Sequence, residues 1–327
     1  MKAIALFSGG LDSTLSVCII KEQGIDVEGV CFISCFFTDK KAKEAAARLK
    51  IPLISVDITE ELISLIKSPP HGFGKGANPC IDCHILMLKK AGSLMKKRGA
   101  NFLITGEVLG ERPKSQNRWA LMLIARESGW EDYLLRPLTA KNLPPTLPER
   151  LGWVKRDKLY GIKGRSRKAQ IELARKFKIE QFPTPAGGCL LTDPNFSRRV
   201  KYLLKTGIVN PGEIELLKVG RHFRLNHHTR IVVGRKKEEN SKIKELATPG
   251  DIILRVKDFP GPTTLIRGTI DEEIIYKAAS ITARYSDAPG KTVDVEYHQI
   301  PGGEVRVIRV LPIDDGEIKK LRIEDSL

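Results

Sequence analysis

The sequence contains no run of about 18 or more apolar residues, the length that a helix needs to cross a lipid bilayer. Its first residues, MKAIALFSGG, lack the long apolar core and the small-residue cleavage site of a secretory signal. Cysteine is scarce as well, with six residues in a chain of 327. Together these absences predict a cytoplasmic protein with no membrane partner, in which the thiols stay reduced.

Two common nucleotide-binding patterns are absent from the glycine-rich segment FSGGLDSTL, residues 7–15. It contains neither the Gly-Lys-Ser/Thr of a Walker A loop nor the G-x-G-x-x-G of a dinucleotide-binding turn. A second glycine-rich segment, GFGKG at residues 72–76, follows Ser-Pro-Pro-His rather than a strand, so we expect a flexible loop there. A P-loop kinase and a dinucleotide-dependent dehydrogenase are therefore both disfavoured.

The positive charge of the chain is concentrated in two windows. The formal net charge is +16. Residues 150–180 carry eleven Lys or Arg against three Asp or Glu, and residues 198–237 carry eleven against two, so the rest of the chain is nearly neutral. Clustered cations release counterions when they bind phosphates, and solubility alone needs no such clustering. This distribution favours a nucleic acid as the partner.

The first half of the sequence alternates between apolar strands and helices. Strands are predicted at residues 2–8, 26–34, 52–58, 101–106 and 133–138, and helices at residues 11–24, 40–50, 60–67 and 84–99. Such alternation predicts an α/β fold, a Rossmann-like parallel sheet with helices on both faces. Ligands of these sheets bind at the carboxyl ends of the strands.

The segment FSGGLDSTL stands at such a strand end. Gly9 and Gly10 allow the backbone to approach a ligand closely, and the amide groups of the following helix face an anion. The polar side chains of this turn, which we expect to bind the nucleotide, are Ser8, Asp12, Ser13 and Thr14.

SGGLDS resembles the pyrophosphate loop of the PP-loop ATP pyrophosphatase superfamily, also called adenine nucleotide alpha hydrolase-like. The resemblance implies that ATP is cleaved to AMP and pyrophosphate and that residues 8–14 hold the pyrophosphate. It also implies that Asp12 lies near Mg²⁺ and that the chemistry adenylates a substrate oxygen.

The segment TGEVLGERPKSQ, residues 105–116, follows another predicted strand. It resembles the Gly-acid-x-Leu-Gly segment, followed by Ser-Gln, of the tRNA 4-thiouridine synthetases. The resemblance implies that Gly106 and Glu107 contribute to the nucleotide site. Arg112 and Lys114 occupy intervening positions, where their charge suits an α-phosphate or an RNA phosphate.

Three cysteines form a second candidate site. Cys80 and Cys83 lie in NPCIDCH, whose C-x-x-C-H pattern is also that of c-type haem attachment, a modification mostly of exported proteins. Cys189 lies in TPAGGCLLTD. The set resembles the branch of tRNA-thiolating PP-loop enzymes in which three thiolates hold a 4Fe–4S cluster. Three ligands leave one iron open, which suits the delivery of sulfide.

Other interpretations of these cysteines stay open. One thiol could carry a persulfide that another resolves, with no metal. A zinc site with His84 as fourth ligand has suitable residue types but needs a tight turn beside Cys83. The three thiols could also be unrelated.

The character of the chain changes near residue 195. Short strands with interspersed cations, a Phe-Pro-Gly turn and the amphipathic helix of DEEIIYKAASITARYSD predict a smaller α+β domain. Its segments VVGRKK and DIILRVKDFPGPTTLIRG resemble the RNA-binding module of the NFACT family. We therefore predict a catalytic domain at 1–193 and an RNA-binding domain at 194–327. The predicted phosphate contacts in the latter are Arg221, Arg224, Arg230, Arg235, Lys236, Lys237 and Arg255.

The sequence thus predicts an ATP- and Mg²⁺-dependent tRNA sulfurtransferase that replaces a uridine carbonyl oxygen with sulfur through a 4Fe–4S cluster. The Ser-Gln motif favours 4-thiouridine at tRNA position 8, with a 2-thiouridine synthetase as the alternative. Sulfide or a sulfur-donor protein is the expected second partner. A homodimer is compatible with this hypothesis as the oligomeric state. Two further hypotheses are a non-catalytic RNA-binding factor and a PP-loop enzyme that acts on a metabolite.

Overall fold

The structure, a computed structural model, describes residues 1–182, 189–289 and 291–325. The chain divides into two compact units, Met1–Leu190 and Leu191–Leu327. Each unit has its own sheet and its own hydrophobic core. Within the described ranges, no helix is both long and apolar enough to cross a membrane.

The first unit contains a five-stranded sheet whose strands are all parallel, as the sequence predicts. The order is β3-β2-β1-β4-β5. Ala3 of β1 pairs with Val27 on one side and with Phe102 on the other, so β1 is central. The strands are β1 (Lys2–Leu6), β2 (Asp26–Ile33), β3 (Leu53–Asp57), β4 (Phe102–Ile104) and β5 (Leu134–Leu135).

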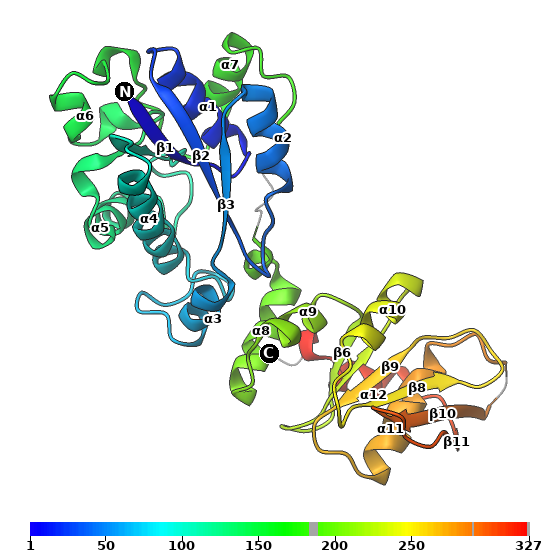
Figure 1. The fold of residues 1–327 in the computed structure, drawn as a ribbon. Coiled ribbons are helices and arrows are strands. Elements are labelled where there is room, and N and C mark those ends of the chain that lie inside the picture. Colours follow the sequence, from blue (N-terminus) through cyan, green and yellow to red (C-terminus); the bar gives the residue numbers. More distant parts are fainter. Residues whose placement is uncertain (183–188, 290, 326–327) are drawn as a thin grey trace. The chain divides into compact units, whose positions relative to one another are not determined.

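Helices cover both faces of this sheet (Figure 1). Because successive side chains of a strand point to opposite faces, Ala3 and Ala5 join one hydrophobic cluster and Ile4 joins the other. The first cluster includes side chains of α1 (Leu11–Lys21), α2 (Lys40–Leu49) and α7 (Lys168–Lys176). The second includes those of α4 (Cys80–Lys97) and α5 (Arg118–Ser128), and α3 (Thr59–Lys67) contacts α4.

Two local predictions for this unit need correction. Helix α4 begins at Cys80 rather than after the cysteine pair, because Pro79 is its N-cap and Cys83 N–H donates to the Pro79 carbonyl at 2.9 Å. The proline-rich segment 141–150, predicted to be a rigid linker, ends in the short helix α6 (Leu147–Arg150). Thr146 and Glu149 start that helix with a reciprocal capping box.

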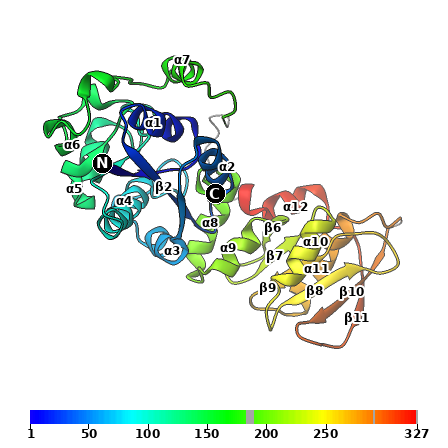
Figure 2. The same cartoon turned by 45° about the horizontal axis from the view of Figure 1, so that its top comes forward.

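The second unit is built on a six-stranded antiparallel sheet with the order β11-β10-β8-β9-β7-β6. Helix α11 (Glu272–Arg284) packs on one face and α10 (Lys237–Glu245) on the other (Figure 2). This arrangement confirms the predicted α+β fold. The strands are β6 (Arg221–Arg224), β7 (Arg230–Val233), β8 (Ile252–Val256), β9 (Thr264–Arg267), β10 (Val293–Gln299) and β11 (Arg306–Val310). The remaining helices are α8 (Pro194–Thr206), α9 (Pro211–Leu217) and α12 (Asp315–Leu321).

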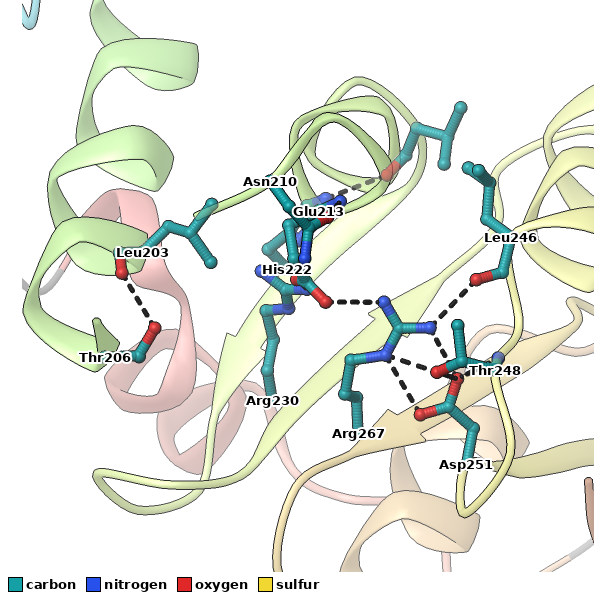
Figure 3. Close-up of polar contacts among 11 residues, drawn as sticks. Leu203, Thr206, Asn210, Glu213, His222, Arg230, Leu246, Thr248, Asp251 and Arg267 are labelled. Atoms are coloured by element: carbon teal, nitrogen blue, oxygen red, sulfur yellow. Dashed lines mark hydrogen bonds and ion pairs between the residues drawn. The ribbon is translucent and has the colours of Figure 1, made fainter. Parts of the chain in front are cut away.

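A buried ionic network ties α9 to this sheet (Figure 3). Glu213 accepts from Arg230 at 2.5 Å and from Arg267 at 2.7 Å. Arg267 also pairs with Asp251 at 2.5 Å and donates to the Leu246 carbonyl at 2.8 Å. Removing one partner of such a network leaves a buried charge uncompensated, so its members fix the position of α9.

His222 is a fully buried, neutral member of the same region. Its Nε2 lies 2.8 Å from the Val219 carbonyl, and Nδ1 has no hydrogen-bond partner among the described residues. Burial, followed by the charges of Arg199 and Arg230, holds the pKa of His222 well below its usual value. The folded unit therefore excludes a proton that the unfolded chain binds.

We predict that the second unit loses stability as the pH falls below about 6.5, the pKa of an unfolded-state histidine. There the unfolded chain binds the proton and the folded chain does not, so the free energy of unfolding decreases by up to about 1.4 kcal/mol per pH unit. Urea unfolding followed by circular dichroism at pH 7.0 and 5.5 measures this slope. His222→Gln should flatten it, and exposed His228→Gln should leave it unchanged. An unaltered slope in His222→Gln would contradict the assignment.

Candidate functional site

The loop after β1 forms an anion cradle at the carboxyl edge of the parallel sheet. Gly9 has φ +72°, and a Cβ there would lie 2.3 Å from the Lys41 carbonyl oxygen, so only glycine fits. Gly10 is the N-cap of α1, and no side chain caps that helix. The amide groups of its first turn, from Leu11 to Ser13, lack intrahelical acceptors and thus favour a bound anion.

The loop after β4 lies directly against this cradle. A Cβ on Gly106 would lie 2.5 Å from the Ser13 nitrogen and 2.6 Å from the Asp12 carbonyl carbon. Ser16 Oγ donates to the Thr105 carbonyl at 3.2 Å, which holds α1 to the end of β4. The two predicted motifs, SGGLDS and TGEVLGERPKSQ, therefore meet where the sheet order reverses, the usual ligand position in such folds.

Asp12 and Glu111 are two half-buried carboxylates in these loops, close enough for the charge of Asp12 to act on Glu111. Burial raises the pKa of Asp12, while the charges of Arg167 and Arg112 act to lower it. Burial, followed by the charge of Asp12, raises the pKa of Glu111. Asp12 Oδ1 and Glu111 Oε2 are buried without a hydrogen-bond partner among the described residues. Two carboxylates that need a cation and lie beside an anion cradle fit a site for Mg²⁺ and a triphosphate.

A third segment, far along the chain, completes the site. Lys163 forms a bridge with Leu109, and Gly164 N–H donates to the Leu109 carbonyl at 2.7 Å. This contact brings Arg167 and the fully buried Gln170 of α7 close to Asp12, whose pKa both side chains influence. Hydrogen bonds of normal geometry are lacking for both polar atoms of the Gln170 side chain among the described residues. Unsatisfied buried amides of this kind mark a place where a polar ligand fits.

Glu111, Arg167 and Gln170 were not among the residues that the sequence singled out. Glu111 lies within TGEVLGERPKSQ and Arg167 within the basic window 150–180, so each stood in a segment already noted. The sequence does not distinguish these three residues from those beside them. The contact between residues 109 and 163–164, visible only in the structure, brings them to the site.

Glu107, which the sequence predicts to bind the nucleotide, belongs to a buried network of hydrogen bonds. Its Oε1 lies 2.9 Å from His84 Nδ1, and its Oε2 accepts from Arg136 at 2.8 Å and from Thr105 at 3.0 Å. The Arg136 charge and the His84 hydrogen bond outweigh burial and hold the pKa of Glu107 far below its usual value. Both oxygens already have protein partners, and one of them holds His84. The predicted contact of Glu107 with the nucleotide stays a prediction.

The three predicted cysteines lie near one another. Cys80 and Cys83 occupy the first turn of α4 and, at i and i+3, share one face of it. Burial raises the pKa of Cys83, with further contributions from the neighbouring Cys189 and Cys80. Leu190 N–H donates to the Phe36 carbonyl at 3.3 Å, which places the residue after Cys189 near the end of β2.

Within the described part of the chain, the three thiols do not surround a metal position. Among the residues that the structure describes, no three Cys, His, Asp or Glu side chains gather as a metal site. The residues that precede Cys189, 183–188 with Gly187 and Gly188, lie outside the described ranges. The ligand types and their proximity fit an iron–sulfur cluster, and closer approach of the three sulfur atoms is required to bind one.

The predicted RNA contacts differ in exposure. Arg112, Arg235, Lys236, Lys237 and Arg255 are exposed, and Lys114, Arg221 and Arg224 are half-buried. Lys114 donates to the His71 carbonyl at 3.0 Å, and Arg235 pairs with Glu239 at 2.5 Å. Arg230 must be removed from the set, because it is 5% exposed and paired with Glu213.

These features describe a parallel α/β unit with an anion cradle at its carboxyl edge, followed by a basic α+β unit. Comparison with known families agrees: the family described as thiamine biosynthesis protein (ThiI) matches residues 1–142, and the NFACT protein RNA binding domain matches residues 220–322. These matches confirm the resemblance of the nucleotide-loop segments to a PP-loop family and of the segments after residue 195 to the NFACT module. The resemblance of the three cysteines to an iron–sulfur branch stays a prediction.

Several individual proteins are similar to this chain. A tRNA-specific 2-thiouridylase of Thermoanaerobacter sp. is 27% identical over 248 residues, covering 68% of this chain and 65% of that protein. A probable tRNA sulfurtransferase of Acetivibrio thermocellus is 32% identical over 119 residues, covering 34% and 29%. A solved structure of a 4-thiouridine synthetase–RNA complex with bound ATP has 19% identity and a TM-score of 0.36, covering 57% and 45%. The chain thus spans less than two thirds of the length of these relatives.

We predict that Gly106→Ala weakens ATP–Mg²⁺ binding by about tenfold or more, since the added methyl group pushes the β4 loop away from α1 and separates Glu111 from Asp12. Isothermal titration measures the affinity. Gly161→Ala is the matched control, because its Cβ meets only the flexible side chains of Lys141 and Asn142 at 3.3 Å or more. Equal affinity of Gly106→Ala and the parent would show that the contact between the loops is unimportant.

Proposed function

We propose that this protein is an ATP-dependent tRNA sulfurtransferase that activates a uridine carbonyl oxygen and replaces it with sulfur. The observation that carries the proposal is that one unit contains both unsatisfied polar groups around Asp12 and three neighbouring thiols. We assign catalysis to residues 1–193 and RNA binding to residues 194–327, in line with the two family matches.

Nucleotide binding rests on charge complementarity. The uncapped first turn of α1 and the glycines of the cradle suit the β- and γ-phosphates, with Ser8, Ser13 and Thr14 as additional donors. Asp12 and Glu111 would hold Mg²⁺, whose charge offsets the cost of their burial. Arg167 and Arg112 then remain to stabilise the negative charge that develops on the departing pyrophosphate.

The reaction has two displacements. The uridine carbonyl oxygen bonds to the α-phosphorus of ATP, the bond between the α-phosphate and its bridging oxygen breaks, and pyrophosphate leaves. A sulfur nucleophile then bonds to the same ring carbon, the carbon–oxygen bond breaks, and AMP leaves with the oxygen. The role of the chain is to hold the reactants in line and to neutralise the leaving groups.

Sulfur delivery is assigned to Cys80, Cys83 and Cys189. A 4Fe–4S cluster bound by these thiolates would supply an iron position that delivers sulfide. His84, held by Glu107, directly follows Cys83 in sequence. A persulfide on one of the three thiols is the metal-free alternative: a donor protein that itself carries a persulfide would pass its outer sulfur to that thiolate and keep its own thiol. Sulfide is a source for the cluster route only.

RNA binding is assigned to the basic surface of the second unit and to Arg112 and Lys114 near the nucleotide site. The exposed cations Arg235, Lys236, Lys237 and Arg255, with Arg221 and Arg224, supply its phosphate contacts. The Ser-Gln pair at 115–116 tilts the proposed product to 4-thiouridine at tRNA position 8. A 2-thiouridine product is the second candidate, because similarity to 2-thiouridylases extends over 68% of the chain.

Substitution of Arg167 tests the adenylation step. We predict that Arg167→Met lowers tRNA-dependent pyrophosphate release by about a hundredfold, the usual loss when a transition-state charge partner is removed. Arg165→Met is the matched control, since Arg165 is exposed and lies two residues away. Equal rates for the two variants would place Arg167 outside the site.

Substitution of the cysteines tests the sulfur site separately. We predict that Cys83→Ser and Cys189→Ser lose iron and acid-labile sulfide after anaerobic reconstitution and lose thiolation, while pyrophosphate release persists. Cys18→Ser is the control, because Cys18 lies within α1. This variant should retain the iron and sulfide, the thiolation activity and pyrophosphate release. Thiolation without iron in the parent protein would replace the cluster with the persulfide alternative.

A further inference from the structure

A cavity of about 640 Å³ opens at the amino-terminal edge of the parallel sheet, opposite the candidate site. Asn101 directly precedes β4 and Tyr133 directly precedes β5, whereas the nucleotide loops follow the ends of β1 and β4. A five-residue strand such as β1 separates the two edges by roughly 17 Å. The principal lining side chains are Lys96, Asn101, Ser128, Trp130, Tyr133 and Trp153.

The aromatic wall of this cavity is held by specific contacts. A Cβ on Gly92 would lie 2.0 Å from Trp130 Cε2 and Nε1, so the indole rests on the backbone of α4 where no side chain fits. Trp130 and Tyr133 pack edge to face, with ring centroids 6.0 Å apart. Lys96, one turn after Gly92 on α4, places its ammonium group 5.1 Å from the Trp130 ring centroid. Gly92, the Trp130–Tyr133 pair and Lys96 thus form one continuous surface, held by contacts between its members.

The polar groups of the cavity are also held in place. Asn101 Oδ1 accepts from the Lys2 backbone amide at 2.9 Å, which fixes the carboxamide and leaves its nitrogen as a donor. Ser128 Oγ donates to the Ala125 carbonyl at 2.7 Å and accepts from the Trp130 backbone amide at 3.3 Å. The cavity therefore offers ring faces, an oriented amide and an ammonium group.

We propose that this cavity binds an unpaired nucleobase of an RNA chain, as a second contact distant from the reacting uridine. Aromatic faces bind bases by stacking, and a neighbouring cation binds the attached phosphate. Its volume is in the range of small-molecule sites. Exposed acids, Glu131 and Asp132, lie between Trp130 and Tyr133, so the cation assigned to the phosphate is Lys96, which lines the cavity itself. The site requires RNA as a partner but does not depend on thiolation.

The tryptophans of the chain permit a local readout. All three, at positions 119, 130 and 153, lie in the first unit, and only Trp119, 63% exposed, does not line the cavity. In a Trp119→Phe protein, indole fluorescence reports only the cavity, whatever RNA binds to the second unit. Titration with an unstructured oligouridylate should give saturable quenching. Titration with uridine 5′-monophosphate distinguishes a free nucleotide, which would quench alone, from a base that needs the RNA chain.

Two substitutions in that background test the assignment. Trp153→Ala should weaken oligouridylate binding to the cavity by about tenfold, the effect of losing one stacking face. Lys96→Gln should weaken it about threefold, as expected for an exposed charge pair, and is a surface change that leaves the fold intact. Lys97→Gln, adjacent but outside the cavity, is the control.

The absence of saturable quenching by either ligand would overturn the proposal. Equal effects of Lys96→Gln and Lys97→Gln would overturn it as well, since only general attraction to phosphate would remain. Thiolation and pyrophosphate release are measured separately, so failure of the cavity proposal and failure of the proposed function are distinguishable.

Discussion

The close contact of Gly106 with the first turn of α1 is the constraint on which the first unit depends. Because β1 lies next to β4 in the sheet, the loops that follow these two strands are forced together, and only glycine allows their backbones to meet. The partial burial of Asp12 and Glu111 in these loops raises the pKa of each carboxyl group. The order of the strands thus places two carboxylates that need a cation beside backbone amides that favour an anion.

The two units use buried charge differently. In the second unit, each carboxylate of the network has an arginine partner: Glu213 pairs with Arg230 and Arg267, and Asp251 pairs with Arg267. In the first unit, Asp12, Glu111 and Gln170 keep atoms without partners among the described residues. Carboxylates that are paired with arginines suit a fixed scaffold, and carboxylate oxygens without a partner suit a site that receives a cation with the substrate.

Sequence periodicity predicted all five parallel strands and both sheets' classes, since buried strands and amphipathic helices leave strong local patterns. The boundaries at Cys80 and around residue 147 were wrong because a proline N-cap and a capping box decide them, and these act over single turns. Arg230 illustrates a further limit: a cation on a short strand looks the same in sequence whether it faces RNA or a buried glutamate. The sequence also contains no sign of the protein partners of Glu107, because Arg136 and His84 reach it from other elements.

The central claim is that one chain joins ATP-dependent activation of uridine to delivery of sulfur. The most direct test incubates the anaerobically reconstituted full chain with unmodified tRNA, ATP–Mg²⁺ and sulfide, then digests the tRNA and identifies its nucleosides by mass spectrometry. The account predicts a thiouridine, with the chromatographic position of 4-thiouridine. An iron-loaded protein that binds tRNA and yields no thionucleoside would contradict it, and an RNA-binding role without catalysis would take its place.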